Sequence, residues 1–424
     1  MRRLSMTLCL LLCAALLFGC GQPAMEYIPM TTEPATAPTT QPTEPATEPA
    51  TEPTTAPTEP QAVTYTLSFA GDCTLGADHD VYSHDKGFIK VVGEQYDYPF
   101  ANALTYFGQD DFTLVNFEGT LCNSGTPAQK TFRFRGPTTY AKILTAGSVE
   151  AVSLANNHVK DYGSAGYKST LDALATEKVT YAEDFGTALY TTASGLKVGI
   201  YAGQFDVNVN DMKKDIAQLR TDGAEIVIAS IHWGTEYAYR PSTSQTKIAH
   251  SAVDAGADIV FGHHPHVLQP VEKYGKGIIY YSLGNFSFGG NRNPMDYDTA
   301  VIQQLVIRNE DGTVSLGETK LIPFRVSSVT DRNDYKPTPY AQDDTGYKRV
   351  LSKLDGTFNG PDLVTDRPST TTTAATTKPA TQPTTQPTTQ PTTQPTEPTT
   401  TPTTQPTEPT TQPSGGMDGN IDLG

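Results

Sequence analysis

The chain has 424 residues, with 30 Lys and Arg against 46 Asp and Glu, and a formal net charge of -16. This acidic balance excludes nucleic acid as a partner, because phosphate binding needs a basic surface. The sequence contains no G-x-S-x-G elbow and no Walker loop, which excludes the commonest serine hydrolases and nucleotide hydrolases.

The first twenty residues predict an export signal. Arg2 and Arg3 precede an apolar run, residues 8–18, that is too short to span a bilayer and has the layout of a secretion signal. The sequence LFGC that follows resembles the bacterial lipobox, which implies cleavage before Cys20 and lipidation of that cysteine; ordinary secretion is the alternative. A lipid anchor would hold the protein on the extracellular face of the cytoplasmic membrane, at the bacterial cell surface.

Two tracts rich in Thr and Pro, residues 31–60 and 368–413, flank the rest of the chain. They have too few apolar side chains to offset the entropy of ordering, so we expect them to be disordered. The predicted organisation is therefore a signal (1–20), a spacer (21–61), one folded domain (62–367) and a tail (368–424).

Short apolar runs in this domain predict buried strands, namely YTLSFA, FTLVNF, EAVSLA, LKVGIYA, EIVIASI, ADIVFG and GIIYYSL. Two segments between them have helical spacing. One places Met212, Ile216 and Leu219 on a common face, and the other is opened by Pro241 and groups Ile248, Ala249, Ala252 and Val253. Strands that alternate with helices predict an α/β sandwich.

Two hairpins are also predicted. Alternating runs on both sides of Asp311 and Gly312 form one of them. The stretch QKTFRFRG forms the other, and its basic residues are expected on a solvated hairpin face. As an alternative, these residues and Arg240 add a cationic edge for an anionic substrate; they are Lys130, Arg133 and Arg135.

Of the five cysteines, only Cys73 and Cys122 lie in the predicted folded domain. An exported protein permits them to pair. We expect them instead to be small buried apolar side chains.

Polar clusters follow six of the predicted strands, where the carboxyl ends of strands line the ligand crevice of layered α/β folds. The clusters contain Asp72; Asn116 and Glu118; Asn156, Asn157, His158 and Asp161; His232 and Glu236; His263, His264 and His266; and Asn285. Taken singly, such residues are usually turns, helix caps or packed histidines. Taken together, Asp, Glu, Asn and His predict a site for one or two divalent cations, with Mn, Zn, Fe or Mg as candidates.

Three of the eight histidines lie within the segment FGHHPHVLQPVE. His264 and His266 are two positions apart, so in an extended segment their imidazoles point to the same side and can share a metal site. Pro265 between them limits the backbone and helps to hold that geometry.

The series GDCTLG, VNFEGTL, SLANNHVKDYG, IHWGTEY, AGADIVFGHHPHVLQPVE and IIYYSLGNFSF resembles the CapA domain family, which is linked to poly-γ-glutamate capsule synthesis. The resemblance extends in order from Tyr65 to Phe288. It implies the fold of the calcineurin-like metallophosphoesterases, a four-layer α/β/β/α sandwich.

The resemblance also implies roles for individual residues. Asp72 matches the first aspartate ligand, Glu118 the bridging carboxylate with Asn116 beside it, and Asn157 the asparagine ligand. His158 matches the histidine that protonates a leaving group, with Asp161 orienting it. The last ligands match His232, His264 and His266, and His263 is the alternative register. Thr74 replaces a histidine of the phosphoesterase pattern, and Asn116-Phe117-Glu118 replaces its Gly-Asp-x-x-Asp motif, which implies one tight and one weak cation.

Three functions are compatible with these residues. The first is an extracellular metal-dependent hydrolase or transferase acting on a phosphoester or on an anionic polymer such as poly-γ-glutamate. The second is a non-catalytic accessory protein that holds the polymer beside a membrane synthase. The third is a surface adhesin, which the Thr/Pro tracts favour and the clustered ligand residues oppose.

Overall fold

The computed structural model describes residues 61–363. The predicted signal, the lipidation site Cys20, the spacer up to residue 60 and the chain from residue 364 onward lie outside this part. Among the described residues, no helix has both the length and the apolar character needed to cross a membrane.

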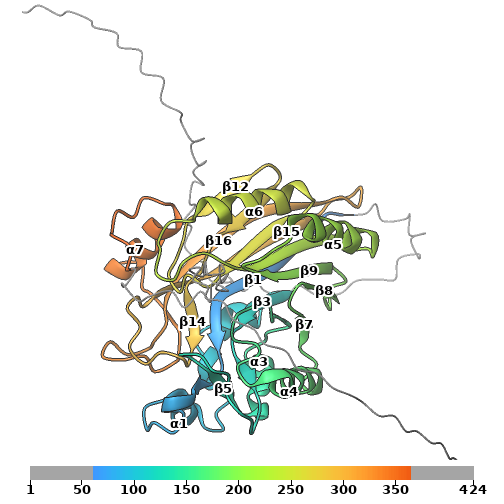
Figure 1. Cartoon of the computed structure of the whole chain (residues 1–424). Coiled ribbons are helices and arrows are strands. Elements are labelled where there is room, and N and C mark those ends of the chain that lie inside the picture. The colour runs from blue at the N-terminus through green and yellow to red at the C-terminus, as the bar shows by residue number, and fades with distance from the viewer. Residues whose placement is uncertain (1–60, 364–424) are drawn as a thin grey trace, which may run out of the picture. The chain divides into compact units, whose positions relative to one another are not determined.

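The first sheet is mixed and contains eight strands (Figure 1). In spatial order they are β17 (Thr338–Pro339), β16 (Val314–Arg325), β15 (Asp298–Arg308), β1 (Val63–Thr74), β3 (Phe112–Phe117), β6 (Ala151–Ser153) and β7 (Thr180–Ala182), and β14 (Asn285–Phe288) pairs with the end of β1. Strands β1, β3, β6 and β7 are parallel. The predicted hairpin at Asp311 and Gly312 is confirmed, since β15 and β16 pair antiparallel.

The second sheet has six strands, in the order β12 (Val271–Tyr274), β13 (Gly277–Tyr280), β11 (Ile259–His263), β10 (Ile226–His232), β9 (Lys197–Gln204) and β8 (Gly186–Thr191). Its central strands are parallel. A small third sheet joins β2 (Ala77–Asp78), β5 (Phe134–Gly136) and β4 (Thr120–Leu121). The stretch QKTFRFRG is therefore not a hairpin, because it contains the single strand β5, which pairs antiparallel with β2 and parallel with β4.

The two large sheets pack face to face through one apolar core. Phe69 of β1 meets Phe261 of β11 with ring centroids 5.1 Å apart, and Leu114, Ile200 and Ile228 belong to the same buried cluster. Such interdigitated inner faces are the usual way in which two sheets exclude water.

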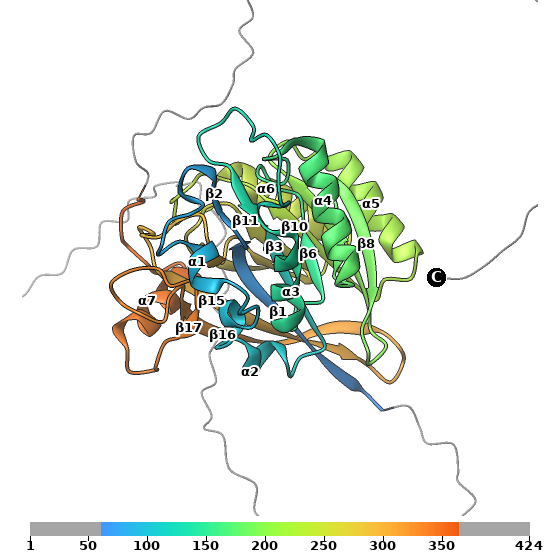
Figure 2. The same cartoon turned by 90° about the horizontal axis from the view of Figure 1, so that it is seen from below.

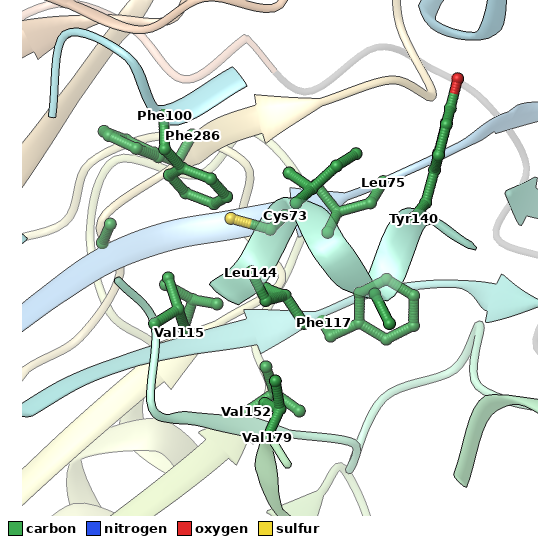
Figure 3. Packing of buried hydrophobic residues seen from close by; sticks show 14 of the residues in the cluster. Cys73, Leu75, Phe100, Val115, Phe117, Tyr140, Leu144, Val152, Val179 and Phe286 are labelled. Carbon is green, nitrogen blue, oxygen red and sulfur yellow. The ribbon is translucent and has the colours of Figure 1, made fainter. Parts of the chain in front are cut away.

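Helices cover both outer faces (Figures 1 and 2). On the first sheet lie α1 (Phe88–Val92), α2 (Leu104–Phe107), α3 (Ala141–Ala146) and α4 (Gly163–Thr176), and on the second lie α5 (Val209–Thr221) and α6 (Thr243–Asp254). The order of layers is thus α/β/β/α, as predicted. Figure 3 shows Cys73 inside the core beneath α3; it and Cys122 are both free and buried, so the expectation of unpaired cysteines is confirmed.

The helices on the second sheet follow the sequence pattern closely. In α5 the buried residues are Met212, Ile216 and Leu219, the three that share the predicted face. Helix α6 begins after the predicted Pro241, since Ser242 is its N-cap and forms a reciprocal capping box with Gln245.

The last helix, α7 (Thr345–Leu354), is fixed to the start of β15 and the residues before it by ion pairs. Lys353 Nζ lies 2.6 Å from Asp296 Oδ2 and 2.8 Å from Asp298 Oδ2, and Arg349 Nε lies 2.6 Å from the same oxygen of Asp298. Burial would raise the pKa of Asp298, but Arg349 and Lys353 outweigh it and lower that pKa. The charges are mutually satisfied, so this network anchors the C-terminal helix.

Candidate metal centre

The predicted ligands meet where the strands of both sheets end. Asp72 lies near the end of β1, Glu118 directly follows β3, and His232 ends β10. His264 and His266 follow β11, Asn157 and His158 lie in the turn after β6, and Asn285 begins β14. Parallel strands bring their carboxyl ends to one edge of a sheet, which explains why residues so distant in sequence converge.

Asp72 is the central carboxylate of this cluster. It is 1% exposed, and its Oδ1 accepts a hydrogen bond from Asn116 Nδ2 at 2.9 Å. His263 Nδ1 lies 3.3 Å from Oδ1 and His266 Nδ1 lies 3.4 Å from Oδ2. Burial would raise the pKa of Asp72, but the adjacent imidazoles of His263 and His266 hold it well below the usual value. Asp72 is therefore an ionised carboxylate in the core of the site.

Glu118 is fully buried and lacks hydrogen-bond donors. Within the described residues, neither of its carboxylate oxygens has a hydrogen-bond partner. Its Oε1 faces His158 Nε2 at 3.7 Å and His266 Nε2 at 3.9 Å, which is too long for a hydrogen bond. Burial raises the pKa of Glu118 to about 8. A buried carboxylate without donors is costly unless a cation coordinates it.

The segment between His264 and His266 is a left-handed turn, so the prediction of an extended segment is wrong. The two residues have backbone φ values of +94° and +56°, a region that residues other than glycine rarely adopt. The rings still reach one side, with centroids 5.7 Å apart. Strain of this kind persists where surrounding contacts fix the backbone, and it is concentrated at functional sites.

The imidazoles of His232 and His264 are buried as neutral rings. The His232 ring lies 4.7 Å from that of His264. Burial lowers the pKa of His264 to about 3 and places that of His232 well below its usual value, with neighbouring histidines adding to both shifts. A neutral imidazole has a lone pair to offer, which is the form that binds a metal.

The register of the histidine triplet follows from the contacts of His263. Its Nε2 lies 2.9 Å from Ser230 Oγ, within β10 and β11, and its Nδ1 faces Asp72. His264 and His266 instead form a ligand group with Glu236, whose donor atoms all lie within 4.8 Å of one another. The geometry thus favours the pair His264 and His266 and leaves His263 as a support for Asp72.

A second group consists of Asp72, Glu118 and His266, again within 4.8 Å. The two groups share His266, whose remaining nitrogen binds one cation at a time, so they are alternative positions for a cation. Asn285 Oδ1 lies 2.9 Å from His266 Nδ1 and orients this shared ring.

The adjacent residues Asn156 and Asn157 have different environments. Asn157 is exposed, and its Oδ1 lies 2.9 Å from His232 Nε2. Asn156 is buried and donates to Asn116 Oδ1 at 3.1 Å and to the Phe117 carbonyl at 2.8 Å. The family resemblance assigned no individual role to Asn156, whose hydrogen-bond partners come from another strand.

His158 has the geometry of an oriented acid–base group. Its Nδ1 lies 2.7 Å from Asp161 Oδ2, which also accepts the Phe134 N–H at 2.6 Å. Lys130 Nζ lies 2.5 Å from Asp161 Oδ1, so Lys130 belongs to the site and is not a residue of a solvated hairpin face. Burial lowers the pKa of His158, although Asp161 opposes the shift. Its other nitrogen is left pointing toward Glu118.

The loop that carries Glu236 is held in place from two sides. The Tyr237 N–H donates to the Pro265 carbonyl at 2.7 Å, and the Leu363 N–H donates to the Tyr237 carbonyl at 3.0 Å. The Tyr239 N–H donates to Asp362 Oδ1 at 2.8 Å. The C-terminal end of the described chain therefore fixes the loop beside the histidine turn.

The residues present fit a divalent cation. Glu118 has two buried oxygens without partners, and the Nδ1 atom of His264 has none among residues 61–363. Carboxylate and imidazole donors of this kind suit borderline and hard divalent metals. The fold and the site together define an α/β/β/α sandwich protein with a candidate metal centre at its strand ends.

The chain belongs to the bacterial capsule synthesis protein family PGA_cap, whose family model matches residues 66–290. It is 30% identical over 304 residues to the capsule biosynthesis protein CapA of Bacillus anthracis, a match that covers 63% of this chain and 71% of the relative. It is 29% identical over 326 residues to the PGA biosynthesis protein CapA of Bacillus subtilis, covering 70% and 80%. The resemblance to the CapA family is thus confirmed.

Among solved structures, the chain is similar to the NAD nucleotidase NadN of Haemophilus influenzae. The match has 13% identity and a TM-score of 0.37, and it covers 70% of this chain and 63% of that one. The family assignment rests on the sequence matches, and the order of layers rests on the sheets themselves.

Proposed function

We propose that this protein acts in the synthesis or export of poly-γ-glutamate, as a metal-dependent hydrolase or transferase. Its family and its similarity to two CapA proteins support poly-γ-glutamate as the polymer on which it acts. The sequence LFGC, with Cys20 as lipid anchor, supports a place on the extracellular face of the cytoplasmic membrane, beside a membrane synthase. Metabolic labelling with a fatty acid would test the anchor, and a Cys20→Ser variant that kept the label would refute it.

Two cation positions follow from the donor groups. Asp72, Glu118 and His266 would hold a cation at one position, and Glu236, His264 and His266 would hold it at the alternative position, since the remaining nitrogen of His266 binds one cation at a time. His232 and Asn157 lie beside them and are candidates to complete the coordination. A bound divalent cation would activate water and polarise the bond to be cleaved.

His158 would transfer the proton. Asp161 fixes the proton of its Nδ1, so Nε2 is the nitrogen that exchanges a proton with the substrate. Lys130 forms an ion pair with Asp161 and donates a hydrogen bond to the Asn157 carbonyl, 2.7 Å away, which holds the turn. In this arrangement Lys130 and Asp161 are positioning residues for His158.

Glu118 carries the proposal. A carboxylate with both oxygens buried and, among the described residues, unpaired is hard to explain in a purely structural cluster. The test is elemental analysis of the purified full chain, followed by assays on phosphoesters and on γ-linked glutamate polymers. His158→Ala should retain the metal and lose turnover, and His250→Ala, a histidine on α6, should retain both.

A non-catalytic accessory role is the second candidate, and Thr74 favours it. This residue stands where the phosphoesterase pattern has a histidine, and its Oγ1 donates to the Glu118 carbonyl at 2.7 Å. It thus supports the backbone of Glu118 and adds no imidazole to the site. Stoichiometric metal and tight polymer binding without turnover on any substrate would establish this role and refute the enzyme.

A further inference from the structure

A pocket of about 230 Å³ lies beside the metal centre. One wall is formed by Ala77, Asp78 and Val81, and the other by the loop from Gly289 to Asn293, with Phe132 at the rim. Arg292 lies on this second wall, two positions beyond the stretch that the family model matches.

An aromatic pair separates the pocket from the centre. The Phe134 ring stacks on His158 with centroids 4.2 Å apart and meets Phe288 at 5.6 Å. The Phe288 ring in turn lies 5.1 Å from that of His266. The pocket and the candidate ligands thus lie on the two sides of this pair.

The pocket wall formed by residues 289–293 touches the same aromatic pair. A Cβ atom on Gly290 would lie 2.7 Å from ring atoms of both Phe134 and Phe288, so the peptide here lies directly against the two rings. Phe132, 40% exposed, stacks on Phe134 with centroids 6.3 Å apart. Phe134 and Phe288 are both 5% exposed, so an extended substrate that reaches both the centre and the pocket would pass over the exposed ring of Phe132.

The charge of Arg292 is not matched by a carboxylate. Within residues 61–363 its guanidinium contacts His84, with Nη1 2.7 Å from Nε2, and it forms no ion pair. Lys130 and Arg133 differ, because they pair with Asp161 and Asp80. An arginine without a carboxylate at a concave site is suited to a carboxylate of a ligand, which it binds through two parallel hydrogen bonds.

The carboxylate that lines the pocket is already engaged. Asp78 Oδ1 accepts the Asp80 N–H at 3.0 Å, and its Oδ2 accepts the Arg133 N–H at 2.8 Å. Asn291 Oδ1 accepts the Asn293 N–H at 2.9 Å, which leaves the amide nitrogen of Asn291 as a donor. The polar groups that the loop offers are therefore mainly hydrogen-bond donors.

We propose that this pocket is a substrate subsite in which Arg292 binds a carboxylate of an extended polyanionic chain while another part of that chain lies at the metal centre. The inference rests on the proposed function, since a γ-linked glutamate chain carries one free carboxylate per residue. Phe132 packs against the methylene groups between these carboxylates. The subsite sets the register of the polymer over the centre.

The test is calorimetric titration of the metal-loaded full chain with short γ-linked glutamate oligomers. Arg292→Gln should weaken the Kd by about tenfold, as expected for a lost charge-assisted hydrogen bond, with unchanged metal content. The Kd of Arg292→Lys should lie between those of the wild type and Arg292→Gln, because lysine keeps the charge and lacks the planar guanidinium group. Lys213→Gln, which removes the same charge from the exposed face of α5, should bind like the wild type.

Equal affinities for wild type and Arg292→Gln would overturn the subsite and leave the proposed function intact. A metal-loaded wild type that binds no oligomer would overturn the proposed function itself. Polyphosphate that competes with the same affinity would overturn the assignment to carboxylates. Should Arg292→Gln fail to fold by circular dichroism, Phe132→Ala tests the opposite rim, and unchanged oligomer affinity in that variant would also overturn the subsite.

Discussion

Replacing Glu118 by glutamine should make the metal-free protein more stable. At pH 9, above the pKa of about 8 that burial gives Glu118, the substitution keeps the shape of the side chain and removes a buried charge that, among the described residues, has no donor and that lies near the carboxylates of Asp72 and Asp161. An unsatisfied buried polar group costs about 1–3 kcal/mol. For a domain of this size, roughly 2 °C in Tm accompanies each kcal/mol, so we expect the Tm to rise by about 4 °C.

The same variant should lose its response to metal. A cation at about a hundred times its Kd stabilises the wild type by about 2.7 kcal/mol, or roughly 5 °C. Glu118→Gln should keep little of this shift, so the order of the two melting temperatures reverses when Mn²⁺ is added. Glu310→Gln, in the exposed hairpin turn, is the matched control and should melt like the wild type. A Glu118→Gln protein that is less stable without metal, or that keeps the full metal shift, would refute the reasoning.

Three further outcomes are expected elsewhere in the domain. Asp298→Asn removes one partner of Arg349 and of Lys353 while Lys353 keeps Asp296, and urea unfolding should show a loss of about 1–3 kcal/mol; a loss below about 0.5 kcal/mol would contradict the anchoring role. Burial raises the pKa of Glu150 from 4.5 to about 7, so the folded state holds a proton that the unfolded chain has already released. The free energy of unfolding should therefore fall as the pH rises from 4.5 to about 7, and Glu150→Gln should flatten this slope in thermal melts. Asp362→Ala removes the acceptor of the Tyr239 N–H, and hydrogen exchange across residues 235–240 should accelerate by about tenfold while β10 stays protected.

The sequence predicted the architecture where the pattern was local. Runs such as FTLVNF and EIVIASI are continuous apolar segments bounded by polar residues, and they correspond to β3 and β10 with at most one residue of difference at each end. The strand-end clusters were also predictable, because most of their residues lie at the end of a strand or within a few positions after it. His232, His264 and Asp72 could thus be grouped before their distances were known.

Other parts of the site depend on contacts that no local pattern contains. Lys130 reaches Asp161 from an irregular loop, and Asn156 bonds to the neighbouring strand β3. The left-handed turn at His264 and His266 runs against residue preference, because packing there outweighs backbone propensity. Helix α7 has a clear amphipathic pattern, but its anchoring by Lys353 depends on residues far from it in sequence.

The candidate ligands also determine when a cation can be acquired. Asp72 and His264 are separated by 192 positions, and they come from different sheets. In a newly synthesised, unfolded chain these donors are scattered, and bringing them together costs loop-closure entropy that only the assembled core repays. Loading must therefore follow folding, so the metal would be drawn from whichever compartment the chain folds in.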